Sequence, residues 1–202
     1  MEMYKFQMKI RFLQFICLFF LSVNISMAEK MIIDDLSDRS GKPDEEFCEN
    51  ESTKWCFVTD KVMGGLSEGS LELKKEGNAY FYRMTGELSL ENNGGFIQFR
   101  TKIENHPNDK SFKGVRLRVR GNNHEYMIHI RTQYLLLPWQ YYQSGFLATD
   151  QWTTIELPFK SFKKSNFYQP STVASRDIKT IGIVAIGKKF EAQIDLASIE
   201  LY

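Results

Sequence analysis

The sequence predicts an all-β domain, either a sandwich or a barrel, from three observations. Apolar and polar residues alternate with period two in many short segments, which is typical of strands with one buried and one wet face. Clusters of Gly, Asn, Asp and Lys separate these segments, as turns do. No segment keeps a sustained helical period, and many short strands without intervening helices are typical of sandwiches and barrels.

The segment 114–121 is the clearest of the expected strands. Its odd positions carry Val115, Leu117 and Val119, whereas its even positions carry arginines. One face of this strand is therefore expected to be buried and the other wet. The same alternation predicts strands over 71–74, 79–84, 95–100, 126–131, 152–157, 181–186 and 194–201, and the segment 158–162 suits one short helical turn. The composition, 43% hydrophobic and 14% aromatic, suits a single packed domain.

The first 28 residues have the pattern of a secretory signal peptide. Three basic residues precede an apolar run over 12–23, and the small residues Ser26 and Ala28 follow it at the −3 and −1 positions. We expect cleavage near Ala28, which leaves a β-sandwich domain over 29–202 that is secreted or periplasmic. The run is short for a membrane span, which needs about 20 residues, so no transmembrane segment is expected in the mature chain. An uncleaved anchor is the alternative.

Two cysteines remain after cleavage, and they predict a disulfide. Cys48 and Cys56 form an even pair in an oxidising compartment. The short loop between them would give a stabilisation of about 2–3 kcal/mol. Two separate buried thiols are the alternative. We predict no metal site and no cofactor: no Cys or His pair has zinc-ligand spacing, and the aspartates near the two ends of the mature chain form too thin a pattern for calcium.

Basic residues on the wet faces of the strands form the first candidate binding site. If their strands share one sheet, they form one basic stripe: Arg100, Arg116, Arg118, Arg120, His129 and Arg131. Guanidinium groups in such a stripe suit an acidic glycan or an acidic protein surface. The alternative is a solvated face balanced by acidic neighbours such as Glu125 and Glu156. A net charge of +1 argues against nucleic acid as a partner.

A glycine-containing segment is the second candidate. Gly64 and Gly65 let backbone N–H groups approach a ligand, and Asp60 and Ser67 flank them with polar side chains. The alternative is a tight connection in which Asp60 and Ser67 bond to the local backbone.

Aromatic residues around three leucines and a proline form the third candidate. Tyr134, Trp139, Tyr141 and Tyr142 are able to stack on sugar rings or to contact a partner. Strand geometry sends Tyr141 and Tyr142 to opposite faces, so at most one of them belongs to the core. Core packing is the alternative for about half of the group.

A family resemblance adds to these patterns. The residues Trp-Cys-Phe-Val-Thr-Asp-Lys-Val-Met-Gly-Gly-Leu-Ser over 55–67 resemble the opening signature of the CIA30 family, which is named for a mitochondrial assembly factor of respiratory complex I. Later blocks agree in order, among them 93–96, 114–121 and 157–162, and the resemblance covers about 32–202. It implies a galactose-binding-domain-like jelly-roll β-sandwich without catalytic residues, and a role in binding or assembly.

Together these observations predict an exported, non-catalytic binding or assembly-factor protein whose ligand is a protein or a carbohydrate. An enzyme is not expected, because the three histidines are scattered and no nucleophile motif lies beside them. Two alternatives stay open. The first is a complex I assembly chaperone acting inside the cell, which the predicted signal peptide disfavours. The second is a glycan-active hydrolase, since acidic residues are frequent enough to supply a carboxylate pair.

Overall fold

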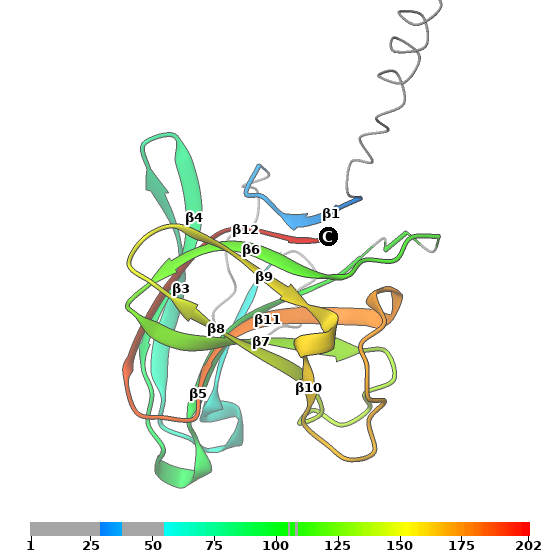
Figure 1. Cartoon of the computed structure of the whole chain (residues 1–202). Coiled ribbons are helices and arrows are strands. Elements are labelled where there is room, and N and C mark those ends of the chain that lie inside the picture. The colour runs from blue at the N-terminus through cyan, green and yellow to red at the C-terminus, as the bar shows by residue number, and fades with distance from the viewer. Residues whose placement is uncertain (1–28, 38–54, 105, 108) are drawn as a thin grey trace, which may run out of the picture.

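The computed structural model describes residues 29–37, 55–104, 106–107 and 109–202, and in these ranges the chain forms strands and short 3-10 turns (Figure 1). The all-β prediction is confirmed. The strands are β1 (Met31–Asp34), β2 (Cys56–Thr59), β3 (Glu68–Glu76), β4 (Ala79–Glu87), β5 (Phe96–Lys102), β6 (Gly114–Gly121), β7 (His124–Thr132), β8 (Tyr142–Ala148), β9 (Thr153–Pro158), β10 (Lys163–Lys164), β11 (Ile178–Ile186) and β12 (Glu191–Leu201). The 3-10 turns are η2 (Asp60–Met63), η3 (Glu91–Asn93), η4 (Phe159–Ser161) and η5 (Ser175–Asp177).

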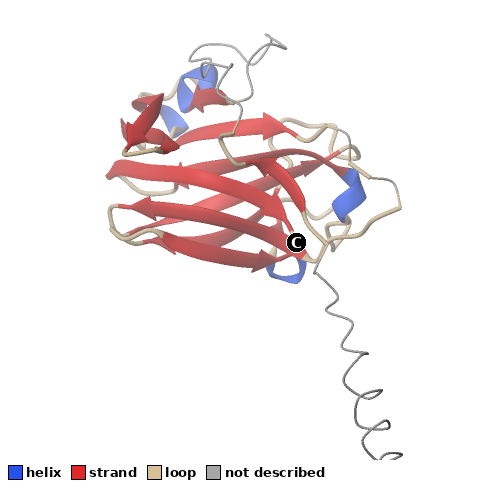
Figure 2. Cartoon of the chain, turned by 90° about the horizontal axis from the view of Figure 1, so that it is seen from above, coloured by secondary structure: helices blue, strands red, loops and turns tan. Residues whose placement is uncertain are grey.

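The strands form two antiparallel sheets that lie face to face, with the short turns at the periphery (Figure 2). Sheet A has the order β3-β4-β12-β6-β9, and β1 also pairs with β12. Sheet B has the order β10-β8-β7-β11-β5-β2. Because many neighbours in each sheet are distant in sequence, the chain crosses between the sheets repeatedly, as in a jelly roll.

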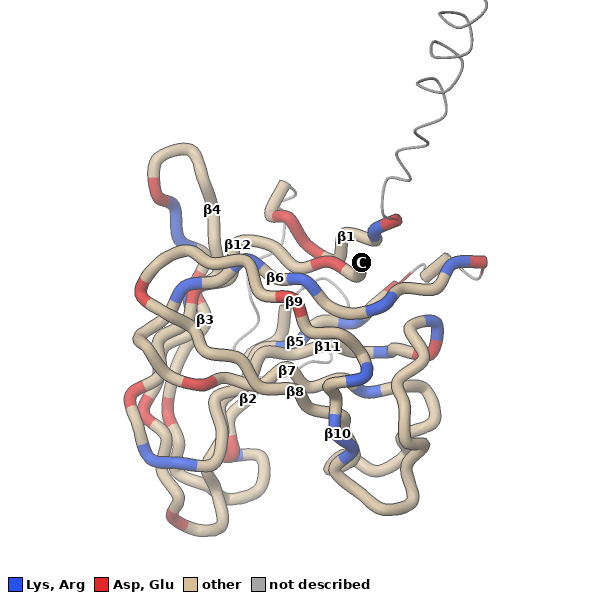
Figure 3. The backbone as a smooth tube through the Cα atoms, in the orientation of Figure 1, with Lys and Arg blue, Asp and Glu red and all other residues tan. Residues whose placement is uncertain are grey.

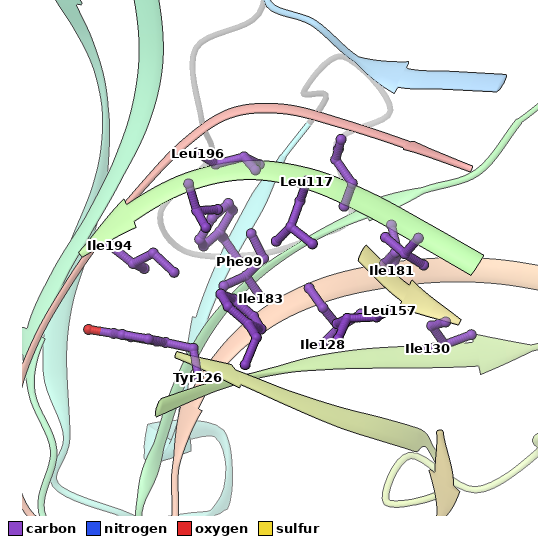
Figure 4. Packing of buried hydrophobic residues seen from close by; sticks show 14 of the residues in the cluster. Phe99, Leu117, Tyr126, Ile128, Ile130, Leu157, Ile181, Ile183, Ile194 and Leu196 are labelled. Carbon is purple, nitrogen blue, oxygen red and sulfur yellow. The ribbon is translucent and has the colours of Figure 1, made fainter. Parts of the chain in front are cut away.

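The core fills the space between the two inner faces (Figure 4). Leu117 and Leu196 of sheet A point towards Phe99 and Ile183 of sheet B, and each of these side chains is at most 1% exposed. Full burial of one such side chain contributes about 1.5–3 kcal/mol. The alternation in β6 is therefore real: its apolar residues face the core and its arginines face outwards.

Trp55 anchors the segment that leads into β2. Its ring packs between Tyr82 and Phe99, with centroid distances of 6.0 and 5.1 Å, and its indole N–H donates to Asp34 Oδ2 over 2.7 Å. Asp34 also accepts from the amide of Leu36. This carboxylate therefore holds β1 against the start of β2.

The sequence located most strands but missed four short or irregular ones. β8 was missed because its buried and exposed positions do not match apolar and polar residues. The polar Ser144 is buried, whereas the apolar Leu147 is 51% exposed. The strands β1, β2 and β10 have four residues or fewer, too few for a period to be read. The short turn predicted over 158–162 is confirmed as η4.

Within the described ranges, no helix is long and apolar enough to cross a membrane. Nor do these ranges contain a group of three or more His, Cys, Asp or Glu side chains able to hold a metal ion. Of the acidic residues near the chain ends, Asp34 accepts from Trp55, and Asp195 accepts from two arginines described below.

Candidate functional site

The prediction that the basic residues form one stripe is wrong, because their strands belong to different sheets. Arg116, Arg118 and Arg120 lie on β6 in sheet A. Arg100 lies on β5, and His129 and Arg131 lie on β7, all in sheet B. The chain changes sheet in the short turn between β6 and β7. Figure 3 marks the basic residues along β5, β6 and β10.

On the outer face of sheet A, arginines pair with carboxylates across neighbouring strands. Arg116 donates to Glu156 Oε1 over 2.8 Å and to Glu200 Oε1 over 2.6 Å. These two carboxylates occupy the register positions beside Arg116 on β9 and β12. Hydrogen bonds to Glu156 and Glu200 raise the pKa of Arg116. The alternative of a face balanced by acidic neighbours therefore holds in sheet A. Of the two carboxylates expected to balance the arginines, Glu156 pairs with Arg116, whereas Glu125 lies on β7 in the other sheet.

The neighbouring arginines converge on one buried carboxylate. Asp195 is 1% exposed and accepts two bonds of 2.7 Å from Arg83 and one of 2.7 Å from Arg120. Arg120 also donates to Glu76 and lies over the ring of Trp152, 4.7 Å from its centroid. These cross-strand contacts hold sheet A together.

The glycine-containing segment is organised around Asp60, which is fully buried. Its carboxylate accepts from the amide and hydroxyl of Ser67 over 2.9 and 2.6 Å, and from the amides of Gly95 and Phe96 over 2.5 and 3.3 Å. Burial raises the pKa of Asp60, but the bonds from Ser67, Gly95 and Phe96 outweigh it, so the pKa is lowered overall. Asp60 thus ties η2 to the start of β5.

Close packing against this carboxylate explains the glycines. A Cβ on Gly65 would lie 2.3 Å from Asp60 Cγ, and one on Gly94 would lie 2.5 Å from Asp60 Oδ2. Gly64 has φ 88°, a left-handed conformation that favours glycine. The structure therefore corresponds to the tight connection. Asp60 and Ser67 are fully buried and hydrogen-bond within the fold, so a ligand does not reach their side chains.

The outer face of sheet B is organised differently, around one row of residues in register across five strands. The row contains Arg100, Gly182, His129, Gln143 and Lys163, and we call it the sheet B row. Gly182 lies on β11 in the middle of the row, and a Cβ there would meet Arg100 Cβ at 3.0 Å and Phe99 O at 3.1 Å. The absence of a side chain at Gly182 leaves room for Arg100 in the centre of the face.

In the middle of this row, His129 stacks on Tyr141, the residue before β8. The ring centroids are 4.0 Å apart and the rings are 12° from parallel. Burial lowers the pKa of His129 to about 4, although a hydrogen bond with Gln143 opposes this shift. The imidazole is therefore neutral at neutral pH, and the pair forms an uncharged aromatic surface.

Two guanidinium groups accompany this aromatic pair. Arg131 donates to the carbonyl oxygens of Pro138 and Leu135 over 2.5 and 3.1 Å, and burial lowers its pKa. Burial, followed by the positive charge of Arg131, lowers the pKa of Arg100. In sheet A, by contrast, hydrogen bonds to carboxylates raise the pKa of Arg83 and Arg116, and at Arg120 burial lowers the pKa but the bonds to Asp195 and Glu76 outweigh it.

The two adjacent tyrosines face opposite ways, as strand geometry predicts. Tyr142 is 1% exposed, and its hydroxyl donates to Pro170 O over 3.0 Å. It belongs to the core, so its prediction as a ligand contact is wrong. Tyr141 lies on the outer face, against His129.

Aromatic side chains extend beyond the edge of the sheet on two loops that are bonded to each other. Ser165 donates its amide to Tyr141 O over 2.9 Å, and its hydroxyl to Trp139 O over 3.2 Å. Gln169 donates to Tyr141 O over 3.0 Å. The exposed aromatic residues of these loops are Tyr134, Trp139, Phe167 and Tyr168, with exposed fractions of 62%, 60%, 84% and 89%.

Sequence reasoning missed Phe167 and Tyr168. The available signal was two successive aromatics among turn-forming Ser, Asn and Pro residues, where a core strand has no place. The predicted disulfide stays a prediction, because Cys48 lies outside the described residues; Cys56 is buried at the start of β2.

The family model for Complex I intermediate-associated protein 30 (CIA30) matches residues 45–197, most of the chain. No curated protein sequence matches the chain.

Solved structures share the fold. A family 11 carbohydrate-binding module of the cellulosomal cellulase Lic26A-Cel5E of Clostridium thermocellum is 15% identical, with a TM-score of 0.63 over 86% of this chain and 94% of that one. The Clostridium thermocellum module in complex with a β-1,3-1,4-mixed-linked tetrasaccharide is also 15% identical, with a TM-score of 0.58 over 85% and 94%. An exo-β-agarase is 5% identical, with a TM-score of 0.51 over 85% of this chain and 25% of the agarase. At these identities the likeness is one of fold.

We expect Asp60→Asn to destabilise the protein by about 3 kcal/mol, because an amide replaces a buried carboxylate that accepts four hydrogen bonds. Urea unfolding at pH 7 measures the change. The control is Lys61→Ala at the exposed neighbouring position, which should stay within about 0.5 kcal/mol of wild type. Equal stabilities for the two variants would contradict the role given to Asp60.

We expect His129 to make the protein less stable as the pH falls from about 6.5 to 4. Its folded pKa, about 4, lies below the value of 6.5 for an unperturbed histidine, so the unfolded chain takes up the proton first. The stability at stake is on the order of 3 kcal/mol. Urea unfolding at several pH values in this range measures the free energy of unfolding. We expect this free energy to depend less steeply on pH in His129→Gln than in wild type, and an equal pH dependence would contradict the assignment.

Proposed function

The chain belongs to the CIA30 family, and from the geometry of its outer face we propose that this sandwich is a non-catalytic glycan-binding domain. The ligand lies on the outer face of sheet B. The observation that carries the proposal is the stack of His129 on Tyr141, with Gln143 beside His129 in the strand register and the exposed Trp139 two residues before Tyr141 in the chain. Flat rings with adjacent polar groups suit the apolar faces and hydroxyl groups of sugars.

The second support is the rigid mounting of these aromatics. The loop that carries Trp139 is fastened to the sheet by Arg131 and to the neighbouring loop by Ser165. A surface that is ordered before binding loses less conformational entropy when the ligand arrives. The fold also agrees with this role, since the solved modules of similar fold are carbohydrate-binding modules, one of them in complex with a mixed-linked tetrasaccharide.

A hydrolase is disfavoured by the composition of this face. Hydrolysis of a glycosidic bond generally uses two carboxyl groups on either side of the bond. Among the outward positions of the described sheet B strands, Glu125 is the single carboxylate, and it lies four residues from His129 along β7. The face therefore suits binding without turnover.

The proposal includes export. A signal peptide over residues 1–28 directs the chain to the periplasm or the medium, where a disulfide between Cys48 and Cys56 forms.

A role in protein assembly is the second candidate, and one observation favours it. The turn fixed by Asp60 exposes Val62 and Met63 by 67% and 65%, and Leu66 and Leu90 are about half exposed. Apolar side chains held rigidly in solvent are typical of protein contacts. An assembly factor inside the cell would use this surface instead of the outer face of sheet B.

Affinity electrophoresis and isothermal titration calorimetry against a panel of soluble neutral and acidic polysaccharides test the proposal. We expect one or more ligands to bind, and Tyr141→Ala to weaken binding at least about tenfold. Removing an aromatic side chain that stacks on a nucleic-acid base costs about 1–3 kcal/mol, and we expect a loss of the same order for a sugar ring.

The matched control is Arg118→Ala on the outer face of sheet A, which should bind as wild type does. Loss of binding in Arg118→Ala with retention in Tyr141→Ala would move the site to sheet A. A protein that binds no glycan but retrieves a specific envelope protein, with retrieval lost in Val62→Asp, would favour the assembly role.

A further inference from the structure

The outer face of sheet B carries an unequal distribution of charge. Its outward basic residues are Arg100, Lys102, Arg131 and Lys163. Its one outward carboxylate in the described strands, Glu125, lies opposite Leu147 near the other end of the face, about 13 Å along β7 from His129. Among the described strand residues, the end of the face that holds the aromatic pair therefore carries basic side chains and no carboxylate.

The strand register gives the spacing of these charges. Thr180 pairs with Lys102 on one side and with Arg131 on the other, so these two cations lie two strands apart, at about 10 Å. Lys163 belongs to the sheet B row together with His129, and it lies two strands from His129 on the side away from β5. The cations therefore surround the aromatic pair on both sides.

The cross-strand neighbours of Arg131 differ from those of Arg116 and Arg120 in sheet A. In sheet A, carboxylates occupy the register positions beside Arg116 and Arg120, whereas Arg118 lies between Ser198 and Thr154. In sheet B the residue beside Arg131 in the register is a threonine, and the residue beside His129 is a glycine. Arg131 donates two of its five N–H groups to the carbonyl oxygens of Pro138 and Leu135, and these uncharged acceptors do not neutralise its charge.

Resting on the glycan-binding function proposed above, we infer that the glycan held by this face is a polyuronate. The sugar rings lie on Tyr141 and its neighbours, and their carboxylates are met by Arg131, Lys102 and Lys163. A guanidinium fork matches the two oxygens of a carboxylate, and lysines supply charge at the flanks. Burial lowers the pKa of Arg131, which agrees with a cation that has a threonine as its neighbour on β11 and gains a carboxylate from the ligand.

The test compares polygalacturonate with fully methyl-esterified polygalacturonate, which has the same backbone without the charge. Calorimetry at low and at physiological salt should give binding to the acid form and at least about tenfold weaker binding to the ester, because a hydrogen bond to a charged group contributes about 1.5–3 kcal/mol. Higher salt should weaken binding to the acid form and leave the ester unchanged.

Variants assign the effect to this face. Lys102 and Lys163 are exposed, so the double variant Lys102→Ala/Lys163→Ala keeps the fold and should weaken binding to polygalacturonate about tenfold. Arg131→Lys should retain more affinity than Arg131→Gln, since it keeps the charge but loses the fork. The control is Arg116→Gln on sheet A, which should not change affinity; its thermal midpoint and those of the other variants report whether each one folds.

The outcomes separate this inference from the proposed function. Equal binding to the acid and the ester would contradict a polyuronate ligand and leave the glycan-binding function in place. The same holds if mixed-linked β-glucan binds and its binding is weakened by Tyr141→Ala but not by the lysine variants. Stronger binding to heparin than to polygalacturonate would replace carboxylate by sulfate as the ligand group, and equally strong binding to poly-L-glutamate would indicate an acidic polypeptide; both overturn the inference. Binding to none of the glycans would overturn the function as well.

Discussion

The antiparallel register of β5, β11 and β7 is the constraint on which the candidate site depends. It aligns Arg100, Gly182 and His129 in one row and sets Arg131 beside Thr180 in the next. Because side chains alternate between faces, a slip of one residue in this register would turn the row into the core and bring Ile128 and Ile130 to the surface. Those isoleucines are fully buried, so the hydrophobic core keeps the polar row on the outer face.

The same residue type has different roles on the two sheets, and the cross-strand neighbour decides which. Arg116 faces Glu156 and Glu200, and its charge is used within the sheet. Arg131 faces a threonine, and its guanidinium holds a loop through carbonyl groups that leave its charge in place. The charge of Arg116 therefore stabilises sheet A, whereas our proposal assigns the charge of Arg131 to a ligand.

Much of the fold was readable from the sequence, since alternation is a local property. It located β6 at its observed limits and identified which of its faces is buried. The sheet to which a strand belongs depends on pairing between distant segments, so the division of the arginines between two sheets was not readable. For the same reason the alternation that correctly separated Tyr141 from Tyr142 could not reveal that His129 lies against Tyr141. Asp60 shows the remaining limit: the sequence suggested both a ligand cradle and a tight connection, and only its burial and four hydrogen bonds distinguish them.

The most direct measurement of the central claim is an amide chemical-shift titration of the 15N-labelled domain with an oligogalacturonate. We expect the amides whose chemical shifts change to be concentrated in β5, β7, β8 and β11 and in the loop before Tyr142, with β6, β9 and β12 unaffected. Shifts concentrated on the outer face of sheet A, or around Val62 and Met63, would contradict it.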